Sequence, residues 1–290
     1  MKRRTLLAGI VAATALYTTN MATAAETMRF AVTDIAGLEN LQREFGAFKA
    51  ALEKTTGYDV KFFPVNSRTA AVEALNAKQV DFVLTGPAEY VVFKQRSKAN
   101  VVIGWQRPDY FAQIVVMAEG PIKKPGDLKG KKVSFGEVGS TSQHLGPAQA
   151  LADLGLDYGK DYDPQIISRN VAIEALIKGD LQAVGMNFTH LEKIRSAFPN
   201  QAFTVIARGR DLPNDILISG AHVSGEMHNK LRTAFIERGE QMMAAVLTGD
   251  DNQKYKRGQF LAGIKDSDYD YVRSMYRTIG VKTFDKFVGN

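Results

Sequence analysis

The feature that most constrains the fold of this 290-residue chain is its alternation of short apolar segments with segments of helical periodicity. Apolar segments with strand character lie at 28–33, 58–65, 80–84 and 101–105. The pattern restarts after Gly120-Pro121, and the further expected strands are 132–135, 166–167, 181–186, 203–207 and 216–219. Such alternation is typical of parallel sheets with covering helices. The sequence therefore predicts an α/β fold of two halves, followed by helices expected at 227–247 and 269–279.

The first 24 residues predict export rather than structure. A basic start, Lys2-Arg3-Arg4, precedes an apolar, alanine-rich segment, and Ala22-Thr23-Ala24 supplies the small-x-small pattern of a cleavage site. We expect a signal peptide over 1–24 that is cleaved before Ala25. Arg3-Arg4 also allows a twin-arginine signal, but its flanking residues fit that pattern loosely.

Composition argues against several classes of function. No later stretch reaches the roughly 20 apolar residues of a membrane span, and the absence of cysteine excludes thiol nucleophiles, disulfides and thiolate metal sites. The formal net charge of +6 falls to +3 once the three basic leader residues are removed, and no basic patch with interleaved aromatics suggests nucleic acid. We expect a monomer with no membrane insertion, nucleic acid, metal or cofactor.

A loop rich in glycines and hydroxyls is the strongest candidate for a binding site. Gly136 and Gly139 allow tight turns after a strand, and Ser140-Thr141-Ser142 are favoured N-cap residues for the expected helix. A helix start has unpaired N–H groups and partial positive charge, so an anion site is one interpretation and a simply capped helix is the other. We expect Pro147 to bend the first turns, because its ring clashes with the carbonyl of Gln143.

Polar residues also follow other expected strands. Ligands of such sheets bind beyond the carboxyl ends of the strands, where these side chains would share a cleft. The residues placed there are Thr33-Asp34, Asn66-Ser67-Arg68, Thr85, Ser168-Arg169-Asn170 and Asn187.

Several blocks of the chain resemble the phosphonate- and phosphite-binding subunits of bacterial ABC importers. The blocks are 72–75 with 80–82, 85–90, 110–116, 121–131 and 135–147. The Gly-x-x-Gly-Ser-Thr-Ser block is fairly specific, whereas the lysine-rich block at 121–131 recurs among binding proteins generally. The resemblance covers nearly the whole chain after the leader and favours the anion interpretation.

This resemblance implies a two-lobed periplasmic binding protein fold of the type II kind, with a mixed, mostly parallel sheet in each lobe. Lobe 1 is expected to comprise 25–111 and 216–290, and lobe 2 to comprise 112–215. The hinge crossovers should lie near 110–112 and 213–216.

The resemblance also implies that Tyr90 and Ser140-Thr141-Ser142 bind phosphonyl oxygens. Three positions depart from the family pattern: Arg68 replaces a frequent tyrosine, Arg169 a histidine and Asn187 an aspartate. Guanidinium groups fork onto phosphate or sulfate oxygens. If both arginines face the cleft, the site should be unusually cationic and should prefer dianions.

The function expected from these observations is capture of a small oxyanion, such as phosphonate, phosphite or a phosphate-like ion, in the periplasm. The protein would close around this ligand and deliver it to the membrane permease of an ABC importer. A sensory accessory protein that presents the anion to a membrane histidine kinase would look the same. An exported hydrolase would need a nucleophile, and Ser140 or Ser142 beside His144 shows no partner for the imidazole. The sequence leaves the identity of the oxyanion open.

Overall fold

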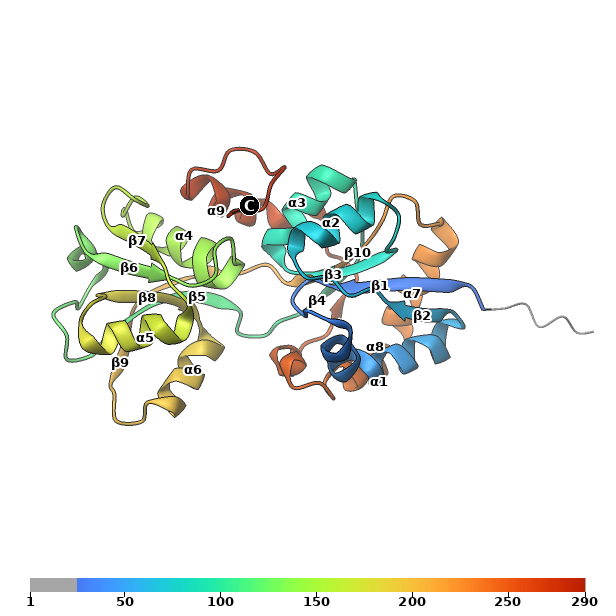
Figure 1. The fold of residues 1–290 in the computed structure, drawn as a ribbon, viewed down its shortest axis with the longest axis horizontal. Coiled ribbons are helices and arrows are strands. Elements are labelled where there is room, and N and C mark those ends of the chain that lie inside the picture. Colours follow the sequence, from blue (N-terminus) through green and yellow to red (C-terminus); the bar gives the residue numbers. More distant parts are fainter. Residues whose placement is uncertain (1–24, 290) are drawn as a thin grey trace, which may run out of the picture.

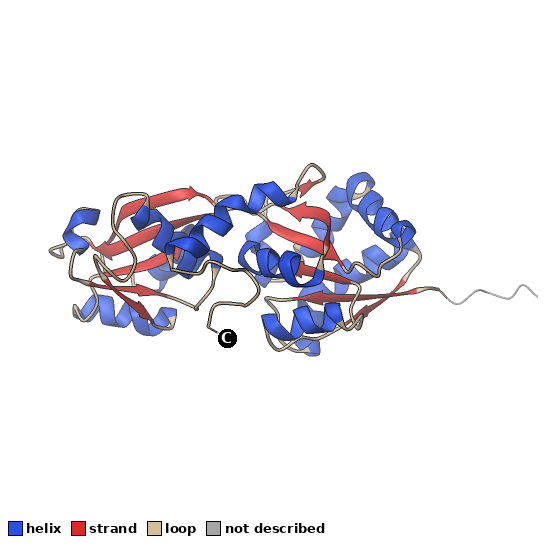
Figure 2. Ribbon diagram, turned by 90° about the horizontal axis from the view of Figure 1, so that it is seen from above, coloured by secondary structure: helices blue, strands red, loops and turns tan. Residues whose placement is uncertain are grey.

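The computed structural model describes residues 25–289, so the expected signal peptide lies outside the described residues. Two β-sheets with covering helices form two lobes that lie side by side along the long axis of the molecule (Figure 1). In the orthogonal view, each sheet is flanked by helices on both of its faces (Figure 2). The expected two-lobed α/β architecture is confirmed. Within residues 25–289, no helix is long and apolar enough to cross a bilayer.

The sheet of lobe 1 draws its strands from both ends of the described chain. Its order is β11-β4-β10-β3-β1-β2, with β1 parallel to β2 and β3, and β10 antiparallel to β3 and β4. These strands are β1 (Thr27–Val32), β2 (Asp59–Phe62), β3 (Phe82–Thr85), β4 (Asn100–Trp105), β10 (Asp215–Ser219) and β11 (Phe260–Leu261). Because β10 lies between two strands of the N-terminal part, residues far apart in sequence share one core.

The helices of lobe 1 are α1 (Leu38–Thr56), α2 (Arg68–Asn76), α3 (Pro87–Ser97), α7 (Gly225–Glu237) and α8 (Gly239–Val246). The single helix expected over 227–247 is therefore wrong. Arg238 leaves helical geometry at φ −122° and ψ 24°, and Gly239, a poor helix former, begins a second helix. The apolar periodicity continues through the break, because Met242 and Val246 of α8 enter the same core as Leu231 and Phe235 of α7.

Lobe 2 repeats the architecture with the sheet order β7-β6-β8-β5-β9. Strands β6, β7 and β8 are parallel, whereas β5 runs antiparallel to β8 and β9. The strands are β5 (Phe111–Met117), β6 (Lys132–Phe135), β7 (Asp163–Ile166), β8 (Ala183–Asn187) and β9 (Phe203–Asp211). The helices are α4 (Gly146–Ala152), α5 (Arg169–Lys178) and α6 (Phe188–Ala197).

Two crossovers connect the sheets, at 106–110 between β4 and β5 and at 212–214 between β9 and β10. The C-terminal segment, assigned to lobe 1 in the sequence interpretation, contacts both lobes. Helix α9 (Asp270–Thr278) packs against α4 of lobe 2 and α3 of lobe 1 (Figure 1). Beyond it, Phe287 packs edge-to-face on Phe93 of lobe 1, while Val288 contacts Gly139 of lobe 2. In addition to the two crossovers, the C-terminal segment therefore forms a third connection between the lobes.

Candidate functional site

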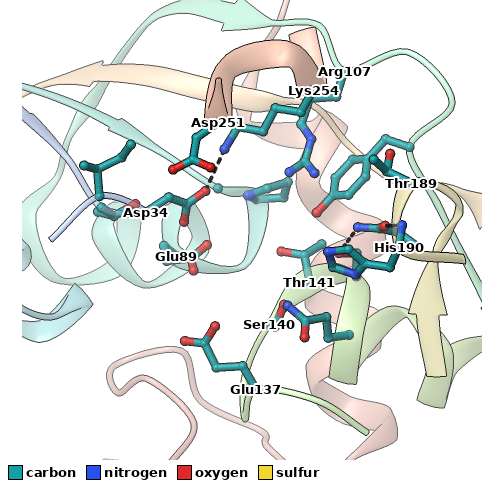
Figure 3. A pocket seen from close by; sticks show the side chains of 18 of the residues that line it. Asp34, Glu89, Arg107, Glu137, Ser140, Thr141, Thr189, His190, Asp251 and Lys254 are labelled. Atoms are coloured by element: carbon teal, nitrogen blue, oxygen red, sulfur yellow. Dashed lines mark hydrogen bonds and ion pairs between the residues drawn. The ribbon is translucent and has the colours of Figure 1, made fainter. Parts of the chain in front are cut away.

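A cleft of about 1010 Å³ lies between the lobes. Lobe 1 contributes Thr33, Asp34, Arg68 and Glu89, and lobe 2 contributes Glu137, Ser140–Gln143 and Asn187–His190. Figure 3 shows Arg107 and Lys254 on one side of this space and Glu137, Ser140 and Thr141 on the other. The carboxyl ends of β1, β3, β6 and β8 all point to this cleft, as expected for an α/β sheet.

The glycine loop is held against the helix that follows it. The Gly136 N–H donates a hydrogen bond to the Gln143 carbonyl at 3.1 Å. In a regular helix this carbonyl would accept from the N–H of residue 147, but Pro147 has no N–H to donate. The expected distortion is present: 141–145 form a π-helical turn before α4 begins at Gly146. Gly139 has φ +74°, a conformation that favours glycine, and Val288 packs against it.

His144 fixes this loop from inside. Its Nδ1 accepts the Gly139 N–H at 3.0 Å, so the ring proton of the neutral imidazole lies on Nε2 and is donated to the Tyr158 hydroxyl at 2.9 Å. Burial lowers the pKa of His144 to about 4. His144 is thus a neutral structural residue, and not the base of a serine nucleophile.

The three hydroxyls of the loop are buried, and those of Thr141 and Ser142 accept hydrogen bonds from other groups. Thr141 Oγ1 accepts the Ala88 N–H at 3.0 Å, which joins the two lobes directly. Ser142 Oγ accepts from Asn187 Nδ2 at 3.0 Å. Within the described residues, Ser140 occupies the N-cap position without a side-chain capping bond, so the simple capping interpretation is wrong.

The side-chain amide of Asn187 is hydrogen-bonded through both its oxygen and its nitrogen. Its Oδ1 accepts the His190 N–H at 3.0 Å and caps α6, while its Nδ2 donates to Ser142. Because both ends of the amide are engaged, Asn187 positions Ser142 on the cleft wall. An aspartate at this place could only accept a hydrogen bond from Ser142, whereas the Asn187 amide donates one and leaves the Ser142 hydroxyl proton free for another acceptor.

Arg68 faces the cleft, but two carboxylates of the protein already bind it. Its Nε pairs with Glu89 of lobe 1, and its Nη1 lies 2.6 Å from Glu137 Oε1 of lobe 2. The Arg68 side chain retains only 23% of its accessible surface. Burial raises the pKa of Glu89 to about 7, with Arg68 opposing the shift and Asp34 and Asp215 adding to it.

Arg107 is a cleft residue that the sequence analysis missed. It lies on the first crossover, and its guanidinium stacks 3.7 Å above the centre of the Tyr110 ring. Its Nη1 lies 3.3 Å from Asp215 Oδ1, and Asp215 also accepts a 2.7 Å hydrogen bond from the Tyr255 hydroxyl. The sequence did contain a signal for Arg107. It is a basic residue two positions beyond the end of β4, and the other candidate residues were chosen because they also follow the ends of strands.

Five residues expected at the cleft lie outside its lining, namely Thr85, Tyr90, Ser168, Arg169 and Asn170. Tyr90 is fully buried in lobe 1 and donates its hydroxyl proton to Asp266 Oδ1 at 2.9 Å. Thr85 lies behind Thr33, with 3.0 Å between their hydroxyl oxygens. Arg169 begins α5, and its buried Nε has no hydrogen-bond partner among residues 25–289.

The charges around the cleft are nearly balanced. Among the described lining residues, six are basic and seven are acidic. The basic residues are Arg68, Arg107, Lys193, Lys254, Lys256 and Arg257, and the acidic residues are Asp34, Glu89, Asp109, Glu137, Glu192, Asp250 and Asp251. Since Arg68 is paired and Arg169 lies elsewhere, the strongly cationic cleft expected from the sequence is not formed.

A fold of two lobes around a polar cleft is that of periplasmic binding proteins, and comparison with known proteins supports this class. The model of the family described as "ABC transporter, phosphonate, periplasmic substrate-binding protein" matches residues 30–269. The chain therefore belongs to this family of substrate-binding proteins, whose members are not enzymes. The description of this family names the periplasm and an ABC transporter.

Individual relatives are more distant. The chain is 35% identical over 114 residues to a putative aliphatic sulfonates-binding protein of Escherichia coli, covering 39% of this chain and 34% of that protein. It is 30% identical over 138 residues to the phosphate-import protein PhnD of Mycolicibacterium smegmatis, covering 45% and 43%. Each match thus spans less than half of the relative's length. The structure of PhnD1 from Prochlorococcus marinus in complex with methylphosphonate shares the fold, with a TM-score of 0.63, 17% identity, and coverage of 89% and 99%.

Proposed function

We propose that this protein captures a small oxyanion of the phosphonate or sulfonate type between its lobes and delivers it to the membrane subunits of an ABC importer. The observation that carries the proposal is the meeting of Arg107 with the hydroxyl-lined loop in one cleft. Tyr110 lies with both, because its ring supports the Arg107 guanidinium and it lines the same cleft as Ser142. A planar guanidinium and adaptable hydroxyl donors together match the geometry of a tetrahedral oxyanion.

Capture and closure are coupled in this proposal through contacts that cross the cleft. The Ala88–Thr141 hydrogen bond and the Arg68–Glu137 ion pair join the lobes only when the cleft is narrow. Opening at the crossovers 106–110 and 212–214 would break both contacts and admit the ligand. A ligand that bonds to both lobes would restore the closed form, which the permease would recognise.

The binding site is tested by replacing Ser140, Thr141 and Ser142 together with alanine. The change removes the acceptors of the Ala88 and Asn187 hydrogen bonds, at about 1 kcal/mol each, so the variant should still fold. A thermal-shift panel of phosphonates, phosphite, phosphate, sulfate and sulfonates should stabilise the wild type. A ligand at 100 times its Kd adds about 2.7 kcal/mol, and we expect the triple variant to lose this gain.

Ser224→Ala provides a matched control for this experiment. Ser224 Oγ caps α7 by accepting the Met227 N–H at 3.1 Å, away from the cleft, so its loss costs about 1 kcal/mol of stability. Ligand affinity should be unchanged in this control. A folded triple variant that binds the panel like the wild type would disprove the site.

Closure is tested by small-angle X-ray scattering with and without the best ligand of the panel. The radius of gyration should decrease on binding, because the two lobes rotate toward each other about the crossovers. Identical scattering profiles at saturating ligand would contradict the proposed mechanism.

A further inference from the structure

Arg68 is the cleft cation that faces both lobes, and the protein itself supplies both of its partners. Glu89 and Arg68 belong to lobe 1, whereas Glu137 lies on the loop of lobe 2, three residues before Ser140. Figure 3 shows the Glu137 side chain extending from the Ser140 loop on the side of the cleft where Glu89 lies. When the lobes meet, the positive charge of Arg68 is therefore matched by two carboxylates before any ligand arrives.

The other cations near the centre of the cleft are also matched. Lys254 Nζ lies 3.1 Å from Asp34 Oδ2, and Arg257 Nη2 lies 2.7 Å from Asp109 Oδ2. Lys193 and Lys256 are exposed residues of the cleft lining. Arg107 has a longer contact, 3.3 Å, to Asp215, and Asp215 is already stabilised by the Tyr255 hydroxyl. Arg107 is thus the buried cation best able to share its charge with a ligand.

From this arrangement we infer that Glu137 is a specificity-determining residue that restricts the cleft to oxyanions carrying a single negative charge. The inference rests on the proposed function, because it concerns the same site. Arg107 and the loop hydroxyls compensate one negative charge. A second charge would meet the carboxylates of Glu137, Glu89 and Asp34, and the lining cations beside them, Arg68 and Lys254, are already paired with these carboxylates. Arg169, which lies outside the lining, also attracts Glu137. The preference for dianions that the sequence suggested is therefore reversed.

The charge of Glu137 can be tested without disturbing the fold. Its side chain retains 57% of its accessible surface, so Glu137→Gln should fold like the wild type. The glutamine keeps the shape of the side chain but releases one edge of the Arg68 guanidinium. That edge can then bind a second phosphonate oxygen, as guanidinium groups commonly do.

The experiment compares methanesulfonate with methylphosphonate by calorimetry, at a pH well above the second ionisation of the phosphonate. The two probes share shape and differ by one charge. We expect the wild type to bind methanesulfonate at least about tenfold more tightly. In Glu137→Gln this ratio should fall by about tenfold, chiefly through tighter binding of methylphosphonate.

Glu192→Gln is the matched control, since it removes one negative charge from an exposed residue of the same cleft lining. The ratio in this control should stay within about twofold of the wild-type value, because Glu192, unlike Glu137, forms no ion pair with an arginine among residues 25–289, so its loss releases no guanidinium edge. A wild type that prefers the dianion, or a Glu137→Gln ratio equal to that of the wild type, would overturn the inference. Equal weakening of both probes would also overturn it, by showing that Glu137 only holds the lobes together. If the wild type binds neither probe nor any other oxyanion of the panel, the proposed function itself fails.

Discussion

Replacing Arg107 with methionine is expected to weaken oxyanion binding by ten- to a hundredfold and to destabilise the fold by about 3–5 kcal/mol. The binding loss follows because Arg107 is the buried cleft cation whose ion pair is longest. The stability loss follows because Asp215, which is 1% exposed, would keep its charge without a cationic partner. Calorimetry with the best ligand of the panel and chemical denaturation measure the two effects separately.

A double variant separates the two roles of Arg107. Arg107→Met with Asp215→Asn removes both charges, and the asparagine amide still accepts the hydrogen bond of the Tyr255 hydroxyl. Neutral replacement of a whole buried pair is often tolerated. The double variant should therefore regain most of the stability but none of the affinity. Recovery of ligand binding in the double variant would show that Arg107 has only a structural role.

The sequence predicted the two-lobed fold because its signals are local. Short apolar strands and helices with regular apolar spacing are set by near neighbours in the chain. The break between α7 and α8 was missed for the same reason. Both helices bury their apolar residues in one core, so the spacing of those residues continues across Arg238 and Gly239. The spacing of apolar residues therefore cannot reveal a break between two helices that bury their apolar residues in the same core.

Some of the expected site residues line the cleft and others do not, and the difference has a geometric cause. Successive residues of a helix point about 100° apart, so Glu89 and Tyr90 at the start of α3 cannot face the same way. Glu89 lines the cleft and Tyr90 enters the core. The motif located the correct turn, but the periodicity of α3 was not strong enough to decide which residue faced inward. At the end of β3, Thr85 similarly lies behind Thr33.

The pairing of Arg68 could not be derived from the sequence. Its partners Glu89 and Glu137 lie 21 and 69 positions further along the chain, and one of them belongs to the other lobe. From the sequence alone, a basic residue at a strand end looks available to bind a ligand. Only the structure of the opposing lobe shows whether an acidic residue is already paired with it. The charge balance of an interlobe cleft is a tertiary property, and the ion pairs of Arg68 are what led us to infer a preference for singly charged ligands.

Glu89→Gln is expected to make the protein progressively more stable than the wild type as pH rises from 4.5 to about 7. The ordinary pKa of a glutamate is 4.5, and burial raises that of Glu89 to about 7 in the folded protein. Between these values the unfolded chain releases a proton that the folded protein retains, so the wild type loses stability as pH increases. A pKa raised from 4.5 to about 7 corresponds to about 3 kcal/mol of wild-type stability, fully present below pH 4.5 and lost above pH 7.

The comparison of the two proteins isolates this effect. Burial lowers the pKa values of His144 and His190 to about 4 and 3, which removes stability as pH falls below 6.5. That loss is common to the wild type and Glu89→Gln, so it cancels in the difference of their unfolding free energies. Chemical denaturation at half-unit steps from pH 4.5 to 8 should show this difference growing toward about 3 kcal/mol. Glu192→Gln, which changes an exposed carboxylate, should show a constant difference. A constant difference in Glu89→Gln as well would mean that Arg68 keeps Glu89 ionised throughout this range, and the cleft would then carry its full negative charge at neutral pH.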